Sequence, residues 1–309
     1  MKMYERTGEY FSNLAIVQLW EEMERRFYAA SAGVPRHWQI PWLACDAVGG
    51  EDEAAIPAVT AIACAHIGII LVDDMLDSDP RGEYRKVGAG AAANLAMAFQ
   101  SAALESLASA NLPLGMRFAA IEEMNAAFLA TALGQFWDAQ SINDEESYWR
   151  VAQTKSSPFF GAAFYLGGLM GGADIKTADR LKELGRLYGE MIQIHDDLND
   201  SLETQANPDW VQKRSPLPIL FAKLVDHPDR ARFTTLSRNI HAPGALEEAQ
   251  EILIRCGAVS YCVDQLTRRN QSARAKLAVL PLKKRESVEG LFERVIAPVW
   301  NVLEMTEKI

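Results

Sequence analysis

Apolar residues recur every three or four positions along most of the chain, a spacing that predicts helices. It is clearest over residues 9–30, 116–139, 147–171, 177–203 and 246–276. No segment shows the period-two alternation of a strand. Clusters rich in Gly, Pro and Asn separate the helical segments, for example at residues 33–35, 79–82 and 111–113. We therefore expect an all-α chain of about ten helices, folded as one domain over residues 1–309.

Two of the expected helices, residues 56–72 and 159–173, carry almost no charge. A helix without a polar face belongs at the centre of a large bundle or in a membrane. Residues 56–72 would span roughly 25 Å, which is short of the ~30 Å of a bilayer core. They also run directly into Asp73 and Asp74. We expect no membrane span, and instead a large helical bundle around a central apolar cavity.

Composition narrows the classes of function. The formal net charge is −10 and hydrophobic residues make up 49% of the chain, which indicates a globular protein. The acidic balance argues against a nucleic-acid partner. The four cysteines form no C-x-x-C pair, and no apolar run follows the charged residues at positions 2–6. These features predict reduced thiols and a cytoplasmic location.

Acidic residues interrupt the apolar pattern at two places with the same spacing. Asp73, Asp74 and Asp77 follow one apolar segment, and Asp196, Asp197 and Asp200 follow another. Positions i, i+1 and i+4 share one side of a helix, so each set gathers three carboxylates, which are costly together without cations. Oxygen ligands favour Mg²⁺. A single copy is typical of a solvated or capping cluster, but two copies favour Mg²⁺ ions that hold a diphosphate.

With these two motifs the chain resembles the trans-isoprenyl diphosphate synthase (polyprenyl synthetase) family, from about residue 30 to residue 225. The second motif, preceded by Gln193, resembles F-Q-x-x-D-D-x-x-D. Three further segments are similar to family motifs in the correct order: Gly134-Gln135 with Asp138 (G-Q-x-x-D), Thr154-Lys155 (the lysine–threonine segment), and Lys213-Arg214 before Ser-Pro-Leu-Pro (K-x-T-L-P).

The resemblance implies an all-α class I isoprenoid synthase fold, a homodimer, and three Mg²⁺ ions in each active site. The metal ligands that it implies are Asp73, Asp74, Asp77, Asp196, Asp197 and Asp200. The diphosphate and substrate contacts that it implies are Lys155, Arg81, Arg85, Lys213, Arg214, Gln193, Gln135 and Arg36. Lys155 and five of the aspartates, all except Asp200, are the implied catalytic residues.

The reaction implied is a prenyl transfer. Ionisation of an allylic prenyl diphosphate leaves a carbocation in an apolar tunnel, where isopentenyl diphosphate attacks it and a proton is lost. The product would be a longer trans-prenyl diphosphate of about C15–C25. On the resemblance, Gly68 and Ile69, which precede the first motif, face the tunnel floor and are not bulky, which permits chains of about C20 or longer.

The chain departs from the family at three places. After the first motif, Arg81 and Arg85 are spaced differently from the family's adjacent arginines, and Ile192 replaces the Phe of the second motif. The largest departure is in the N-terminal basic segment. The family's basic motif G-G-K-R-x-R-P corresponds here to residues 32–38, where Val34, Pro35 and His37 replace the Lys and both Arg. Either Arg36 and His37 serve the same anion, or the isopentenyl diphosphate site is weakened. The alternatives are a prenyltransferase with another acceptor and a class I terpene cyclase. A non-catalytic subunit is disfavoured because both aspartate motifs are intact.

Overall fold

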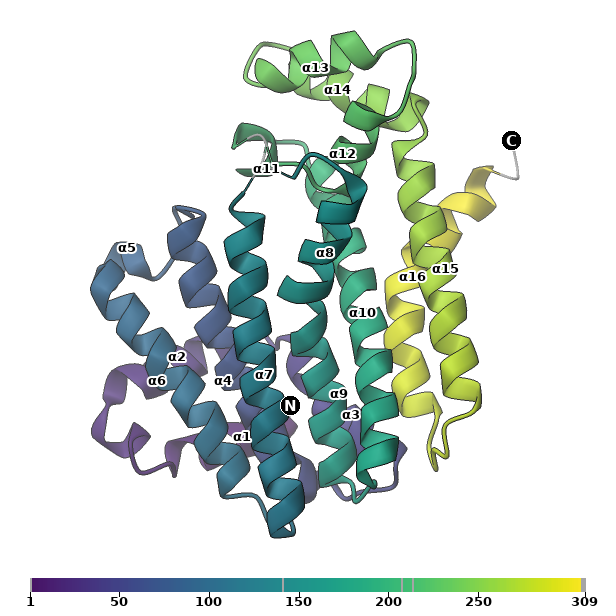
Figure 1. Ribbon diagram of the computed structural model, residues 1–309. Coiled ribbons are helices and arrows are strands. Elements are labelled where there is room, and N and C mark those ends of the chain that lie inside the picture. Colours follow the sequence, from purple (N-terminus) through teal and green to yellow (C-terminus); the bar gives the residue numbers. More distant parts are fainter. Residues whose placement is uncertain (1, 141, 207, 213, 307–309) are drawn as a thin grey trace. The chain divides into compact units, whose positions relative to one another are not determined.

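The structure is a computed structural model that describes residues 2–140, 142–206, 208–212 and 214–306. These residues form sixteen α-helices and two short 3₁₀ helices, and no strand. The helices of the N-terminal half are α1 (Lys2–Ser12), η1 (Val17–Leu19), α2 (Glu21–Ser31), η2 (Arg36–Gln39), α3 (Ile40–Ala47), α4 (Asp52–Leu76), α5 (Tyr84–Val87), α6 (Ala89–Ala108) and α7 (Leu114–Asp138) (Figure 1). Those of the C-terminal half are α8 (Glu145–Lys155), α9 (Ser157–Met170), α10 (Ile175–Ser201), α11 (Pro208–Val211), α12 (Leu217–Leu224), α13 (Arg230–Arg238), α14 (Ala245–Arg255), α15 (Ala258–Ala278) and α16 (Glu286–Thr306).

The all-α prediction is confirmed, but the helices outnumber the ten that were expected because three of the predicted segments are broken. Residues 147–171 divide at Ser156 into α8 and α9, with Pro158 in the first turn of α9. Residues 246–276 divide at Gly257, whose φ of +86° ends α14 before α15 begins. Residues 9–30 contain three helices, α1, η1 and α2. A periodic pattern does not reveal a break that keeps the phase of the apolar face.

The chain divides into two compact units. The first contains Met1–Ala132, Pro158–Arg186 and Lys276–Gly290, and the second contains Leu133–Ser157, Leu187–Ala275 and Leu291–Ile309. Several helices therefore begin in one unit and end in the other. A single domain over residues 1–309 stays a prediction.

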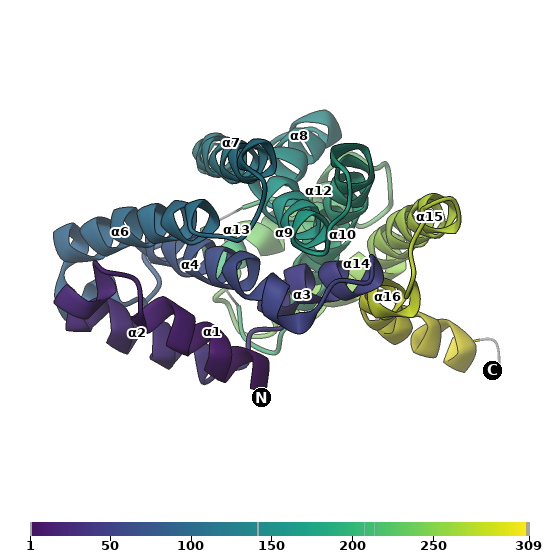
Figure 2. The same cartoon turned by 90° about the horizontal axis from the view of Figure 1, so that it is seen from below.

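In the first unit, α4 is the central helix. It packs against α6, α3, α1 and α2, and Figure 2 shows α1 and α2 on one side of the α4–α6 pair. Among the described helices, α4 alone is long and apolar enough to cross a membrane, but most of it is buried within the protein. Its side chains Ile62, Ile67 and Leu71 are at most 1% exposed. This burial places the first aspartate motif at the end of a core helix.

Glycines in this unit allow helix backbones to approach closely. A Cβ atom on Gly167 of α9 would lie 2.2 Å from the carbonyl oxygen of Pro41 in α3. A Cβ on Gly185 of α10 would lie 2.4 Å from the carbonyl oxygen of Phe160 in α9. The small residues of the uncharged segment 159–173 therefore serve tight packing.

In the second unit, α12, α13 and α14 pack on one another around a small apolar core. That core includes Phe233, Ile252 and Leu253, all buried, and Trp210 of α11 joins it. α8 also packs against α12. The C-terminal half of α10, which carries the second aspartate motif, belongs to this unit.

Candidate functional site

The first aspartate motif ends α4. Asp73 and Asp74 lie in the last turn, and Asp77 caps the C-terminus. All three are partly exposed. Carboxylates are unfavourable at this end of a helix, where backbone carbonyls carry partial negative charge. The pKa of Asp74 is raised, first by burial and then by Asp79, so a bound cation would stabilise this end of α4.

A pair of arginines on α2 lies beside this motif and was missed in the sequence. Arg25 and Arg26 both form ion pairs with the buried Glu83, at 2.9 and 3.4 Å. Arg26 is close enough to oppose the rise in the pKa of Asp74, and its buried Nε has no hydrogen-bond partner. The charged pattern of residues 21–26 is typical of a solvated helix face, so periodicity gives no signal for these arginines.

The two arginines that were predicted after the first motif are exposed. The side chain of Arg81 is 87% exposed, and its guanidinium forms an ion pair with Asp79 at 2.8 Å. Arg85 stacks over the ring of Tyr84, 5.0 Å from its centroid. Arg81 lies in the turn that follows α4 and Arg85 in the short helix α5 after it, so both remain candidates for diphosphate contact.

The altered basic segment gives its two candidate side chains different environments. Arg36 is exposed in η2. The ring of His37 instead packs edge-on against Phe160, with centroids 5.0 Å apart, and lies 6.0 Å from the ring of His66. The expectation that both residues serve one anion stays a prediction.

The second aspartate motif lies within the last two turns of α10, and its three members differ in burial. The side chain of Asp196 is 59% exposed, Asp197 is 5% exposed, and Asp200 is partly buried. Burial raises the pKa of Asp200 to about 6, with further contributions from Asp209 and Asp196. Asp209, at the start of α11, was not predicted from the sequence, where it reads as the first turn of a short helix.

Asp197 accepts three hydrogen bonds from the second unit. Its Oδ2 accepts from the Tyr148 hydroxyl at 2.7 Å and from the Leu217 N–H at 2.8 Å. Its Oδ1 accepts from Nε2 of Gln193 at 2.8 Å. Burial raises the pKa of Asp197 to about 7 although these donors oppose the shift. The carboxylate therefore connects α10 to α8 and to the start of α12, and its role as a metal ligand stays a prediction.

Lys155, the last residue of α8, is held by the segment that resembles G-Q-x-x-D. Its Nζ donates to Oδ2 of Asp138 at 2.6 Å, and both side chains are 20% exposed. A Cβ on Gly134 would lie 2.3 Å from the backbone nitrogen of Lys155 and 2.5 Å from its Cα. The glycine and the aspartate of this segment thus fix the backbone and the ammonium group of Lys155.

The remaining residues that were predicted to contact the substrate have different surroundings. The amide oxygen of Gln193 accepts from the Ser156 hydroxyl at 2.7 Å. Gln135 is 6% exposed, and its buried Oε1 has no hydrogen-bond partner. Arg214 forms an ion pair with Asp209 at 3.7 Å. Lys213 lies outside the described residues.

The donors present fit Mg²⁺. Both motifs offer carboxylate oxygens alone, the ligand type of hard cations. Burial first, and neighbouring carboxylates second, raise the pKa values of Asp74 and Asp200, and a bound cation would offset both effects. Within the described ranges, no three His, Cys, Asp or Glu side chains are already gathered as a metal site. The first motif belongs to one compact unit and the second to the other.

Solved structures and sequence relatives are similar to this chain over much of its length. The crystal structure of geranylgeranyl pyrophosphate synthetase from Pyrococcus horikoshii Ot3 is similar with a TM-score of 0.81 and 24% identity, covering 95% of this chain and 94% of that one. Octaprenyl diphosphate synthase of Escherichia coli (strain K12) is 26% identical over 278 residues, which is 86% of each chain. Geranylgeranyl diphosphate synthase of Methanosarcina mazei is 29% identical over 167 residues, about half of each chain.

The fold is that of the all-α isoprenoid synthases. The model of the polyprenyl synthetase family matches residues 39–252, more than half of the chain, and the protein belongs to that family. The family that the motifs predict is confirmed, and with it a prenyltransferase.

Proposed function

We propose that the protein is a Mg²⁺-dependent prenyl diphosphate synthase that couples an allylic prenyl diphosphate to isopentenyl diphosphate. One observation carries most weight: the G-Q-x-x-D segment holds Lys155 in place in the unit that contains the second aspartate motif. The matched family supplies the reaction class. A homodimer and a cytoplasmic location are part of the proposal: the first rests on the family resemblance, and the second on the unpaired cysteines and the N-terminal residues.

In this proposal the residues of the chain bind and orient a diphosphate. Bound Mg²⁺, held by the aspartates of the two motifs, supplies positive charge to the leaving diphosphate. Lys155 adds a positioned ammonium group, which stabilises the same negative charge as it develops. Asp138 keeps that ammonium from swinging into solvent. Apolar helices such as α4 exclude water from the carbocation.

Product analysis tests the proposal. The protein is incubated with Mg²⁺ and geranyl, farnesyl or geranylgeranyl diphosphate, each with and without isopentenyl diphosphate. A longer prenyl diphosphate, about C15–C25, that forms only with isopentenyl diphosphate is the expected result. A hydrocarbon or alcohol that forms without isopentenyl diphosphate would instead identify a terpene cyclase and overturn the proposal.

A prenyltransferase with another acceptor is the second candidate. It is favoured by the segment at residues 32–38, where Arg36 is exposed and the His37 ring packs on Phe160. If allylic diphosphate is consumed with Mg²⁺ only when a different nucleophile is added, this candidate replaces the first.

A further inference from the structure

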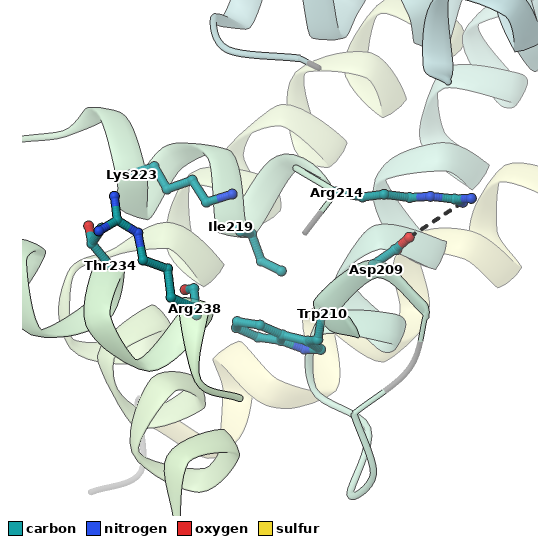
Figure 3. Close-up of a pocket in the computed structure, with 8 residues that line it drawn as sticks. Asp209, Trp210, Arg214, Ile219, Lys223, Thr234 and Arg238 are labelled. Atoms are coloured by element: carbon teal, nitrogen blue, oxygen red, sulfur yellow. Dashed lines mark ion pairs between the residues drawn. The ribbon is translucent and has the colours of Figure 1, made fainter. Parts of the chain in front are cut away.

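A pocket in the second unit lies beside α11, α12 and α13. Its volume is about 260 Å³, and eight residues line it: Asp209, Trp210, Arg214, Ile219, Lys223, Thr234, Ser237 and Arg238 (Figure 3). Trp210 and Ile219, which are 2% and 1% exposed, supply an apolar wall. Figure 3 shows the Lys223 side chain extending toward Ile219. Of the eight residues, the sequence analysis singled out only Arg214.

The lining carries more positive than negative charge. Arg214, Lys223 and Arg238 are cationic, and Asp209 is the single carboxylate among the eight. Asp209 forms an ion pair with Arg214. The Lys223 ammonium donates to the neutral hydroxyl of Ser215 at 3.0 Å, and no ion pair to Lys223 or Arg238 occurs among the described residues. The pocket therefore has a positive charge that its own carboxylate does not balance.

Burial makes this imbalance costly. Desolvation lowers the pKa of Lys223, with no opposing carboxylate to restore it. A partly buried ammonium is stabilised when an anion joins it. The hydroxyls of Thr234 and Ser237 donate to backbone carbonyls of α13, at 2.9 Å each. The two cations, and not these hydroxyls, are thus the groups available to an anionic ligand.

We propose that this pocket binds a small phosphate-bearing molecule, with its charge on Lys223 and Arg238 and any short apolar part on Trp210 and Ile219. The volume lies just below the range of about 300–1,000 Å³ that is common for ligand pockets. A diphosphate or a five-carbon diphosphate fits such a space, whereas a long prenyl chain does not. The site needs no metal, which separates it from the aspartate motifs.

Calorimetric titration of the full chain tests the proposal. The probe is inorganic diphosphate in low salt with excess chelator, because without Mg²⁺ the aspartate motifs repel diphosphate. Lys223→Met and Arg238→Gln should each weaken binding by about tenfold or more, since hydrogen bonds to charged groups are the stronger ones. Arg232→Gln is the matched control: it removes the same charge from α13, but Arg232 pairs with Glu248 and does not line the pocket.

Several results of this titration would overturn the proposal. No binding to the unmodified protein, or equal binding by the unmodified protein and both pocket variants, would overturn the proposal. So would an equal loss in Arg232→Gln. Arg238 is exposed, so Arg238→Gln should fold normally even if Lys223→Met does not. Turnover plays no part in this measurement, and a failed proposed function would leave it unaffected.

Two further titrations identify the source of the phosphate group. Isopentenyl diphosphate that binds more tightly than inorganic diphosphate would mean that the ligand carries a short apolar part, and Ile219→Ser should then remove the difference. Equal affinities would assign the pocket to free diphosphate. In both cases Lys223→Met should weaken binding of the probe as it does for inorganic diphosphate.

Discussion

The two aspartate motifs have identical spacing and different surroundings. At the end of α4, Asp73, Asp74 and Asp77 are all partly exposed. In α10, Asp196 is exposed and its neighbour Asp197 is buried, with three protein donors. Adjacent helix positions point about 100° apart. Spacing therefore determines which carboxylates share a side of a helix, but the neighbouring helices decide which of them remains available to a ligand.

The difference follows from what packs on each helix end. Tyr148 of α8 and Leu217 of α12 reach Asp197 in the second unit, so one side of the α10 motif faces protein. In the α4 motif Asp77 is the C-cap of the helix, and Ser78, with a φ of +57°, turns the chain directly after it. The comparison predicts different results for substitutions at equivalent positions.

The largest effect is expected from the first aspartate of each motif, which is partly exposed in α4 and exposed in α10. Asp73→Ala and Asp196→Ala should each lower turnover with Mg²⁺ by about 10²-fold or more, because positioned charge at a developing anion contributes that much. Helix content should not change, and the free energy of unfolding should shift by less than about 0.5 kcal/mol. Steady-state kinetics with circular dichroism checks this. Near-normal rates in either variant would refute Mg²⁺ binding by these motifs.

Asp197→Ala should differ from these two variants, because it should lower the free energy of unfolding. The Tyr148 hydroxyl and the Leu217 N–H would lose their acceptor in the protein interior, and the partly buried Gln193 amide would lose the same acceptor. Each buried donor left alone costs about 1–3 kcal/mol, so we expect a loss of about 2 kcal/mol or more in urea unfolding.

Two comparisons sharpen the Asp197 result. Asp197→Asn keeps one oxygen acceptor and should restore part of the stability, and if it also restores turnover, Asp197 is not a metal ligand. Tyr148→Phe combined with Asp197→Ala should destabilise by less than the sum of the single changes. If Asp197→Ala leaves stability unchanged, the bridging role is wrong.

A smaller effect is expected where Lys155 is positioned. Gly134→Ala places a Cβ within 2.5 Å of the Lys155 backbone, and relief of such an overlap costs about 1–3 kcal/mol. Turnover should fall in the same direction as in Lys155→Gln. Gly115→Ala is the control in the same helix, because nothing lies within 4 Å of its Cβ, and it should be neutral or slightly stabilising. Equal turnover in the two alanine variants would exclude this packing effect.

The remaining effects concern the pH dependence of stability, and the buried groups of α4 and α10 should act with opposite signs. Burial, with help from His37, lowers the pKa of His66 in α4 to about 4, so between pH 6.5 and 4 the unfolded chain binds a proton that the folded chain does not. Stability falls as pH falls through that window. Asp197 of α10 has a folded pKa of about 7, against 3.8 when unfolded. Its contribution is present below pH 3.8 and is lost as pH rises toward 7.

Unfolding curves between pH 4.5 and 7.5 measure both effects. His66→Gln should reduce the loss of stability on the acid side, and Asp197→Asn should reduce the loss toward neutral pH. Gln at position 66 can still accept the hydrogen bond that Trp38 donates to Nδ1 at 3.1 Å. A pH dependence that neither variant changes would contradict the assigned pKa directions.

The fold class and both motifs could be predicted from the sequence because apolar periodicity and charge interruptions are local signals. The helix breaks at Ser156 and Gly257 could not, since the apolar phase continues across them. The sequence also does not reveal that Asp197 is buried while Asp196 is exposed, because this difference depends on helices that are distant in the chain. Arg26 and Asp209 were missed for the same reason: each lies in an ordinary charged helix and gains its role from a neighbour.

The hydrogen bond from Leu217 to Asp197 also fixes the register of the chain. Leu217 stands between Pro216 and Pro218, and proline has no backbone N–H. Within these three residues, only one alignment can offer a donor to the carboxylate of α10. A slip of one residue in either direction would present a proline and leave the bond unmade. Leu217 thus anchors the end of the segment that carries Arg214, in which the described residues between α10 and α12 form the short helix α11.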